Sequence, residues 1–384
     1  MTVVKNINPD LIIWARERAG YTQEDLSKKI PQLIAWETGQ KKPTLRQLEN
    51  FANKVYVPIG YLFLKKPPKE DLGITDFRTI DNENFQIQSL NMLDTIYLCQ
   101  SRQVWYHDYA LDNYIDPCDF VGSVNLDSDP KSIAQIMRDT LNFSLDEQKN
   151  IHGCDELLNN LYDHAESIGI LIMVSSIVGN NTHRRLNGEE FSGFALSDKY
   201  APLIFINSAA RKQAQMFTFA HELAHIFLGQ SGISNINMNY YFEEQSSIEM
   251  WCNYVAAEFL LPIDELKSVY KSDSTIYDNI NIISNLYNVS RLVTILRLHT
   301  ANIISNEMLH HLYGLEISKV KKTKSGSGCD FFYSLCTRSS KRFTKALLSS
   351  TLEGGTLFND ACKLLAIQKV DHIYTLAKRL DIMS

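Results

Sequence analysis

The sequence lacks the features of membrane-embedded and secreted proteins. Among its 384 residues, no apolar run reaches the roughly 18 residues that a transmembrane helix needs. The N-terminus has no apolar stretch followed by small residues, so we expect no signal peptide. Its seven cysteines are scattered and form no CxxC pair, which favours a reducing compartment over a disulfide framework. We therefore predict a cytoplasmic protein with no membrane partner.

Low-complexity tracts and internal repeats are also absent. Hydrophobic residues make up 45% of the chain and charged residues 21%, which is ordinary for a globular protein and excludes wholesale disorder. At about 150 residues per domain, the length predicts two or three domains.

The chain has little excess of charge of either sign, since its net charge is only −6. Basic and acidic residues are, however, unevenly distributed along it. Residues 1–70 hold 12 Lys/Arg against 7 Asp/Glu, and residues 319–384 hold 12 against 5. The middle of the chain is strongly acidic and repels phosphate, so any nucleic-acid contact is expected at the ends. Solvation of surface helices explains the basic ends equally well, because their excess charge is modest for a DNA-binding module.

The first 66 residues are predicted to form a bundle of short helices. Gly20 is placed to end the first helix, and Thr22 and Thr44 each open a capping box at a helix start. Residues 36–44, WETGQKKPT, resemble the string that follows the recognition helix in the XRE-type helix-turn-helix family. That resemblance implies DNA binding through this domain, and a homodimer on two-fold DNA sites.

One departure from the helix-turn-helix pattern changes this expectation. Between Thr22 and Glu37 the sequence is about four residues shorter than the family pattern, roughly one helical turn, and Pro31 stands at the turn. The groove-facing helix is therefore predicted to be short. Docking of a protein partner is the alternative role for residues 1–66.

The rest of the chain is predicted to be helix-rich with a few strands, an α+β fold. Residues 64–73 read as a linker, and residues 67–155 as a helical connector. A mixed domain over residues 156–318 is expected to precede a small basic C-terminal module, residues 319–384. Helices are predicted over 85–115, 133–141, 154–168, 211–228, 247–261 and 290–303, and after Ser339; strands over 170–178 and 191–207, with a turn at 197–199.

The most informative segment is the helix-like stretch RKQAQMFTFAHELAHIFLGQSG, residues 211–232, in which Gly229 supplies the stop. His221, Glu222 and His225 form H-E-x-x-H within it. Histidines four residues apart lie on one helix face, so both imidazoles can bind a single zinc ion. Glu222 lies beside them, where it can take a proton from a water on the zinc.

A zinc site of this type needs a third protein ligand. The next predicted helix offers Glu249 and Glu258, nine residues apart and so on opposite faces. Only one of them can face the metal. Glu249 is favoured, because Asn253 shares its face and could orient a histidine. Glu258 lies in an apolar stretch and is better explained by helix packing with a buried partner.

The string H-E-L-A-H followed by E-x-x-x-N-x-x-A-A-E-x-L-L-P resembles the ImmA/IrrE family of metallo-endopeptidases. The strand segments within 181–207, the D-F-R string at 76–78 and the tail C-D-F-F-Y…R-F-T-K are similar to it as well. The resemblance implies a zincin-like domain that holds one zinc per chain through His221, His225 and Glu249, with Glu222 as general base.

The resemblance also implies a function. Members of the family cleave repressor proteins that silence stress or mobile-element genes, and some long forms resemble the partner of a toxin. We therefore predict a zinc-dependent endopeptidase that cleaves a regulatory protein, a repressor or toxin-system partner encoded nearby. The alternative is a DNA-binding transcriptional regulator or antitoxin that neutralises its partner by binding, with a zinc site that is not catalytic. An intact H-E-x-x-H favours the enzyme, because a structural zinc site does not need Glu222.

The residue that would stabilise the oxyanion is left unassigned. His183, Arg184, Tyr240 and Tyr241 lie near the motif in sequence, but no spacing argument singles out one of them. The helix predicted at 290–303 could offer a second winged-helix-like contact surface, although packing on the mixed domain is the simpler explanation. The basic run KVKKTK at 319–324 is best explained as a solvated linker.

Overall fold

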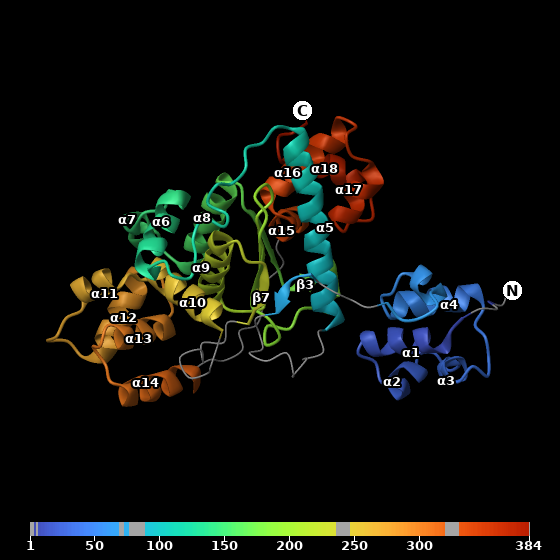
Figure 1. Cartoon of the computed structure of the whole chain (residues 1–384), viewed down its shortest axis with the longest axis horizontal. Helices are drawn as coiled ribbons and strands as arrows, with labels where there is room; N and C mark the ends of the chain where they lie inside the picture. The colour runs from blue at the N-terminus through green and yellow to red at the C-terminus, as the bar shows by residue number, and fades with distance from the viewer. Residues whose placement is uncertain are drawn as a thin grey trace. The chain divides into compact units, whose positions relative to one another are not determined.

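The computed structural model describes residues 4, 7–68, 73–76, 89–235, 246–318 and 330–383 (Figure 1). Contacts within the chain divide it into two compact units. The first comprises residues 1–73 with 85–96, and the second comprises 74–84 with 97–384. The boundaries predicted near residues 155 and 318 both fall inside the second unit.

The first unit is a bundle of short helices around its own apolar core. Its elements are α1 (Pro9–Arg18), α2 (Gln23–Ser27), α3 (Leu33–Glu37), α4 (Leu45–Lys54) and the 3-10 helix η1 (Ile59–Phe63). Leu11, Leu26, Leu33, Leu48 and Phe51 are fully buried at its centre. This small core matches the bundle expected from residues 1–66.

Local capping determines where these helices begin and end. The predicted box at Thr44 is complete: its hydroxyl accepts from the Gln47 amide, and the Gln47 side chain accepts from the Thr44 amide. Gly20 has a φ of +73° just beyond α1, a conformation that glycine adopts at little cost. The helix α3 is only five residues long, as the short spacing predicts. The assignment of this unit to the helix-turn-helix class stays a prediction.

The second unit is built around a five-stranded mixed sheet, with a separate two-stranded hairpin. The order in the sheet is β1-β7-β5-β6-β2, and β3 pairs with β4 in the hairpin. The pairs β2–β6 and β1–β7 are parallel, whereas β5 is antiparallel to both of its neighbours. The strands are β1 (Thr75–Asp76), β2 (Leu171–Ser175), β3 (Ile177–Val178), β4 (Asn181–Arg185), β5 (Gly193–Leu196), β6 (Leu203–Asn207) and β7 (Gly232–Ser234).

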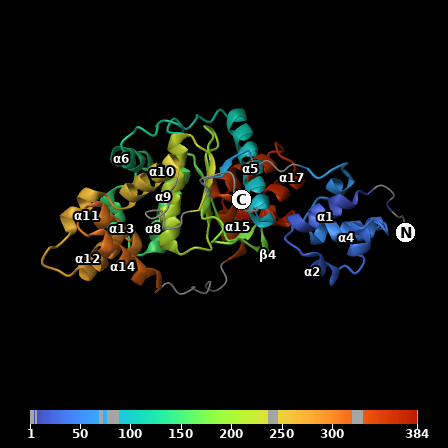
Figure 2. The same ribbon diagram turned by 60° about the horizontal axis from the view of Figure 1, so that its bottom comes forward.

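Some of the remaining helices cover the two faces of this sheet, and others pack on those helices. The remaining helices are α5 (Leu90–Asp112), α6 (Pro130–Leu141), α7 (Leu145–Asn150), α8 (Cys154–Ser167), α9 (Lys212–Leu228), α10 (Ser247–Leu260), α11 (Ile263–Val269), α12 (Ile276–Leu286), α13 (Arg291–Thr300), α14 (Asn306–Ser318), α15 (Phe331–Ser339), α16 (Lys341–Leu352), α17 (Phe358–Leu364) and α18 (Asp371–Arg379). Figures 1 and 2 show α8 and α9 on one face, and α5 with α15 and α16 on the other. The helix-rich α+β fold class is confirmed.

Most of the elements expected in this unit are present. The strands expected at 170–178 and 191–207 form, and so do the helices that end at Gly229 and before Pro262. Ser290 caps α13 as expected, and α13 is packed into the core, so the simpler explanation of that helix holds. The short strands β1 and β7 were not expected. The C-terminal helices begin at Phe331 rather than after Ser339, because Asp330 caps α15.

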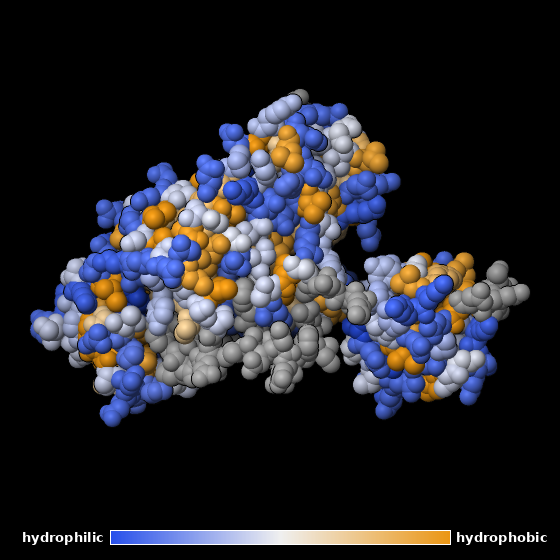
Figure 3. All heavy atoms as spheres, in the orientation of Figure 1, coloured by the Kyte–Doolittle hydropathy of each residue, from blue (hydrophilic) through white to orange (hydrophobic). Residues whose placement is uncertain are grey.

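Several predicted features fall outside the described residues. These are the C-terminal part of the linker at 64–73, the start of the helix expected at 85–115, most of the D-F-R string, and KVKKTK. No helix in the described ranges is long and apolar enough to cross a membrane. The face shown in Figure 3 mixes hydrophilic and apolar residues, both over the C-terminal helices and over α6 to α14.

The C-terminal helices are fixed to the sheet by a buried arginine. Arg102 on α5 is 3% exposed, and its guanidinium donates to the carbonyl oxygens of Leu364 at 2.8 Å and Arg338 at 2.9 Å. These carbonyls lie at the ends of α17 and α15, where helices leave acceptors without intrahelical partners. Burial lowers the pKa of Arg102 to about 10, so it still carries its charge at neutral pH.

A half-buried glutamate on α8 completes this attachment. Glu166 on α8 accepts hydrogen bonds from the Ser340 hydroxyl and from the backbone amides of Lys341 and Arg342. A carboxylate at the start of α16 satisfies amides that a helix leaves unpaired, and it interacts favourably with the helix dipole. The C-terminal helices are thereby bound at both helix starts and helix ends.

We predict that Arg102→Ala lowers the free energy of unfolding of the second unit by about 3 kcal/mol, because two buried carbonyls lose their charged donor. Denaturant unfolding monitored by circular dichroism measures this. Lys345→Ala, an exposed site on α16, should change stability by less than about 0.5 kcal/mol. An Arg102→Ala protein as stable as wild type would show that the arginine does not hold these helices.

Candidate metal centre

The H-E-x-x-H segment forms the helix α9, which is almost entirely buried. All of its residues from 215 to 227 are buried. The helix stops at Gly229, which has a φ of +69° and donates its amide to the carbonyl oxygens of His225 and Ile226. Because His221 and His225 are one helical turn apart, their rings lie on the same side of the helix, with centroids 4.8 Å apart.

The structure brings Glu249, on α10, to these two histidines. His225 Nε2 lies 3.1 Å from His221 Nε2 and 3.0 Å from Glu249 Oε1. His221 Nε2 is 3.3 Å from Glu249 Oε2. Both imidazoles are fully buried and Glu249 is 5% exposed. Among the described residues, this trio is the group of His, Cys, Asp and Glu side chains that could hold a metal ion.

The donor set and its spacing fit a zinc ion. Zinc binds imidazole nitrogen at about 2.0–2.1 Å and carboxylate oxygen at about 2.0–2.2 Å, so two ligands of a tetrahedral site are roughly 3.3 Å apart. The three separations of 3.0, 3.1 and 3.3 Å are close to this value. Three protein ligands leave the fourth position open, which is the arrangement of catalytic zinc sites.

Asn253 orients one of the two imidazoles. Its Oδ1 lies 3.0 Å from His221 Nδ1, and an amide oxygen can only accept, so Nδ1 carries the proton. This fixes the tautomer in which Nε2 has its lone pair available for a metal. Asn253 is four residues after Glu249, so one face of α10 supplies both side chains.

Glu222 lies beside the trio in an apolar enclosure. It is fully buried, and neither of its carboxylate oxygens has a hydrogen-bond partner in the part of the chain that the structure describes. Burial raises the pKa of Glu222 to about 8 in the metal-free chain, although the nearby His221 acts in the opposite direction. Ser234 on β7 also favours the charged form, but no hydrogen bond of normal geometry joins the two side chains.

The charges of the trio are coupled in the metal-free chain. Burial alone would raise the pKa of Glu249, but His221 and His225 outweigh it and hold the pKa at about 2. Burial would likewise lower the pKa of His221, but the charge of Glu249 and its hydrogen bond raise it. Burial lowers the pKa of His225. Glu249 is therefore ionised at neutral pH, as a metal ligand must be.

Glu258 points away from the trio, into an ion pair. Its Oε1 lies 2.6 Å from Arg297 Nη2, and its Oε2 accepts from the Ile263 amide at 3.2 Å. Arg297 on α13 is 1% exposed, so this is the buried partner that a carboxylate in an apolar stretch needs.

The C-terminal end of α10 is held by a set of buried polar side chains. Arg297 donates to the carbonyl oxygen of Leu261 at 2.9 Å, and Gln148 donates to that of Leu260 at 3.0 Å. Arg138 on α6 donates to the carbonyl oxygen of Phe259. These donors satisfy the carbonyls that the end of a helix exposes, and they keep Glu249 and Asn253 in register with α9.

Gly193 lets the sheet approach Glu222. A Cβ atom at this position of β5 would lie 2.7 Å from the Phe205 carbonyl oxygen, 2.7 Å from Thr218 Cγ2 and 3.1 Å from Glu222 Oε1. Only glycine fits there without movement of its neighbours. This contact could not be predicted from the sequence, because Gly193 and Glu222 are 29 residues apart.

Of the four residues considered for the oxyanion, the structure describes His183 and Arg184. His183 and Arg184 both lie on β4, the first exposed and the second buried. His183 lines a different cavity. Tyr240 and Tyr241 lie outside the described residues. Ser234 and Arg297, which contact the site and its support, were missed because no motif marks them.

Comparison with known proteins supports a metallopeptidase domain. Residues 165–299 match the family profile of the IrrE N-terminal-like domain, and residues 339–379 match a domain of unknown function. Over 105 residues the chain is 37% identical to the "Radiation response metalloprotease IrrE" of Deinococcus radiodurans. That match covers 23% of this chain and 31% of the relative, so the chain spans less than a third of its length. These findings support the ImmA/IrrE family, and a metalloprotease family implies a bound metal, usually zinc.

We predict that Gly193→Ala destabilises the second unit by about 2 kcal/mol and weakens metal binding, because the new methyl group meets a paired backbone carbonyl and the Glu222 side chain. Thermal unfolding and titration with Zn²⁺ measure the two effects. The matched control is Gly314→Ala on α14, where a Cβ would meet nothing within 4 Å. This control should leave stability unchanged or raise it by up to about 1 kcal/mol. Equal behaviour of the two variants would contradict the tight contact.

A second prediction concerns the pH dependence of the metal-free protein. Glu222 keeps its proton in the folded state up to about pH 8, whereas an unfolded glutamate loses it near pH 4.3. As the pH rises across that window, Glu222 therefore lowers the free energy of unfolding by up to about 1.4 kcal/mol per pH unit. Glu222→Gln removes this contribution, so it should gain on the order of 2 kcal/mol relative to wild type between about pH 5.5 and 7.5. Urea unfolding of chelator-treated protein measures it, and parallel curves for the two proteins would refute the prediction.

Proposed function

We propose that this protein is a zinc-dependent endopeptidase in which His221, His225 and Glu249 bind the metal and Glu222 is the general base. The observation that carries the proposal is the buried trio of donors at tetrahedral spacing, with the Glu222 carboxylate beside the two histidines on α9 and without a hydrogen-bond partner among the described residues. A structural zinc site has four protein ligands and no need of such a carboxylate. The match of residues 165–299 to the IrrE N-terminal-like domain supports the same reaction class.

When bound, zinc would polarise the scissile carbonyl and make a water molecule more acidic. Glu222 then holds the proton that this water gives up, and it passes the proton to the amine that leaves. Its enclosure suits this task, because a carboxyl whose pKa is raised by burial can both take up and release a proton near neutral pH. Asn253 keeps the His221 ring in the orientation that directs Nε2 to the metal.

The substrate we propose is a regulatory protein, a repressor or toxin-system partner encoded nearby, whose cleavage changes gene expression under stress or during mobile-element transfer. Support for this comes from the family resemblance and from the name of the similar protein of Deinococcus radiodurans, a radiation response metalloprotease.

The test combines metal content with cleavage. We expect about one zinc per chain in wild type and in Glu258→Gln, which keeps a hydrogen-bonding partner for Arg297. Glu249→Gln should lose most of its zinc. Glu222→Gln should keep zinc but cleave at least about 100-fold more slowly, because the proton acceptor is gone. Zinc is measured by mass spectrometry on purified full-length protein, and cleavage by incubation with the regulators encoded beside its gene.

Two outcomes would overturn the proposal. If Glu222→Gln cleaves a regulator as fast as wild type, the general-base role is wrong. If Glu249→Gln retains a full zinc while Glu258→Gln loses it, the ligand set is wrong. In either case a regulator that acts by binding becomes the better description, and a gel shift with its own upstream DNA would test that alternative.

A further inference from the structure

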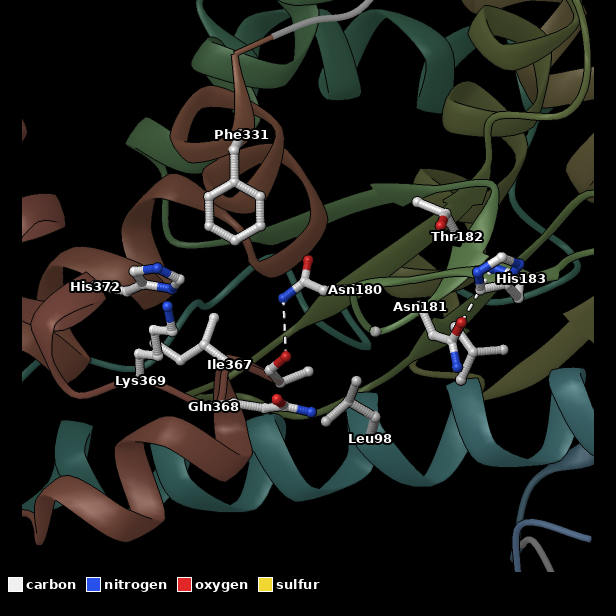
Figure 4. Close-up of a pocket in the computed structure, with 13 residues that line it drawn as sticks. Leu98, Asn180, Asn181, Thr182, His183, Phe331, Ile367, Gln368, Lys369 and His372 are labelled. Atoms are coloured by element: carbon white, nitrogen blue, oxygen red, sulfur yellow. Dashed lines mark hydrogen bonds between the residues drawn. The ribbon is translucent and has the colours of Figure 1, made fainter. Parts of the chain in front are cut away.

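A second cavity lies in the second unit and shares no lining residue with the candidate metal centre. Its volume is about 600 Å³, and it is enclosed by the β3–β4 hairpin, α5 and the C-terminal helices (Figure 4). Small-molecule sites in proteins have volumes of about 300–1,000 Å³. The cavity is therefore large enough for a compound of the size of a mononucleotide.

The walls of this cavity are locked together before any ligand binds. Gly179, at the hairpin turn, has a φ of +54°, and a Cβ there would lie 2.9 Å from the Ala366 Cβ. The side-chain amide of Asn180 donates to the carbonyl oxygens of Leu365 at 2.9 Å and Ala366 at 3.1 Å. Its oxygen accepts from Arg338 Nη1 at 2.8 Å. A cavity with fixed walls loses little conformational entropy on binding.

The polar groups around the cavity favour an anion. Lys369, His372 and His183 are among its lining residues, and no aspartate or glutamate is. Figure 4 shows Lys369 and His372 together at one end and His183 at the other.

An aromatic ring and apolar side chains complete the lining. Phe331 is 41% exposed, and in Figure 4 its ring points into the cavity, above Ile367. Its centroid lies 5.4 Å from that of His372. Aromatic faces are common partners of nucleobases, because every base has a π-face to stack. The cationic end and the aromatic face are thus adjacent in one cavity.

We propose that this cavity is a binding site for a nucleoside monophosphate. The phosphate group lies at Lys369 and His372, and the base packs against Phe331. The inference rests on the lining of the cavity alone and is independent of the peptidase activity. It also gives the C-terminal helices a ligand-binding role, for which neither the metal centre nor the first unit is needed.

The test is isothermal titration calorimetry of the full-length protein with AMP, GMP, CMP and UMP, and with inorganic phosphate and adenosine as partial ligands. We expect at least one of the four nucleotides to bind at least tenfold more tightly than either partial ligand. Lys369→Glu should weaken that nucleotide at least tenfold, because it replaces an attractive charge with a repulsive one. Phe331→Ala should weaken the nucleotide, but it should leave the weak binding of phosphate unchanged.

The matched control is Lys378→Glu, which makes the same charge change at an exposed position of α18 that does not line the cavity. It should bind as wild type does, and the unfolding temperatures of all variants should match that of wild type. If none of the four nucleotides binds at millimolar concentration, the proposal is wrong. If phosphate binds as tightly as the nucleotides, the base does not pack against Phe331 and the proposal is wrong. If Lys369→Glu and Lys378→Glu weaken binding equally, the ligand lies elsewhere and the proposal is also wrong.

Discussion

The fold of the second unit depends on one demand, that the Glu249 carboxylate of α10 be held 3.0–3.3 Å from two buried imidazoles of α9. Ionised groups are costly to bury without partners, so the two helices must keep their register closely. The sheet below α9 and the polar side chains at the end of α10 both meet this demand. Gly193 brings β5 against Glu222, while Arg138, Gln148 and Arg297 satisfy the last carbonyls of α10.

The environment of Glu222 contrasts with that of a second acid, Glu258. The Glu222 carboxylate on α9 has no hydrogen-bond partner in the described residues, which is a local cost to folding. Glu258 on α10 is instead held in an ion pair with the buried Arg297. Within one helix of fourteen residues, Glu249 faces the candidate metal site and Glu258 faces away from it. The three acids therefore differ in environment: Glu249 contacts two imidazoles, Glu222 has no hydrogen-bond partner in the described residues, and Glu258 is paired with Arg297.

Patterns that are local in the sequence could be predicted well. Helix ends at Gly20, Gly229 and Pro262 follow from backbone chemistry, and the spacing of His221 and His225 follows from the helical repeat. Glu249 and Glu258 could be separated because nine residues turn a helix by half a revolution. Contacts between distant segments could not be predicted. Gly193, Arg297 and the cavity beside Phe331 depend on tertiary packing, and strands as short as β1 and β7 carry too little periodicity to detect.

Arg102 has a consequence for how such chains diversify. Its buried guanidinium donates hydrogen bonds to carbonyl oxygens at the ends of α15 and α17. A homologue that lost its C-terminal helices by gene truncation would inherit an arginine facing apolar surface with nothing to bind. Natural selection would then replace it, most simply with leucine or methionine. Residue 102 should therefore be arginine where the C-terminal helices are encoded and apolar where they are not, a correlation that can be read from gene sequences alone.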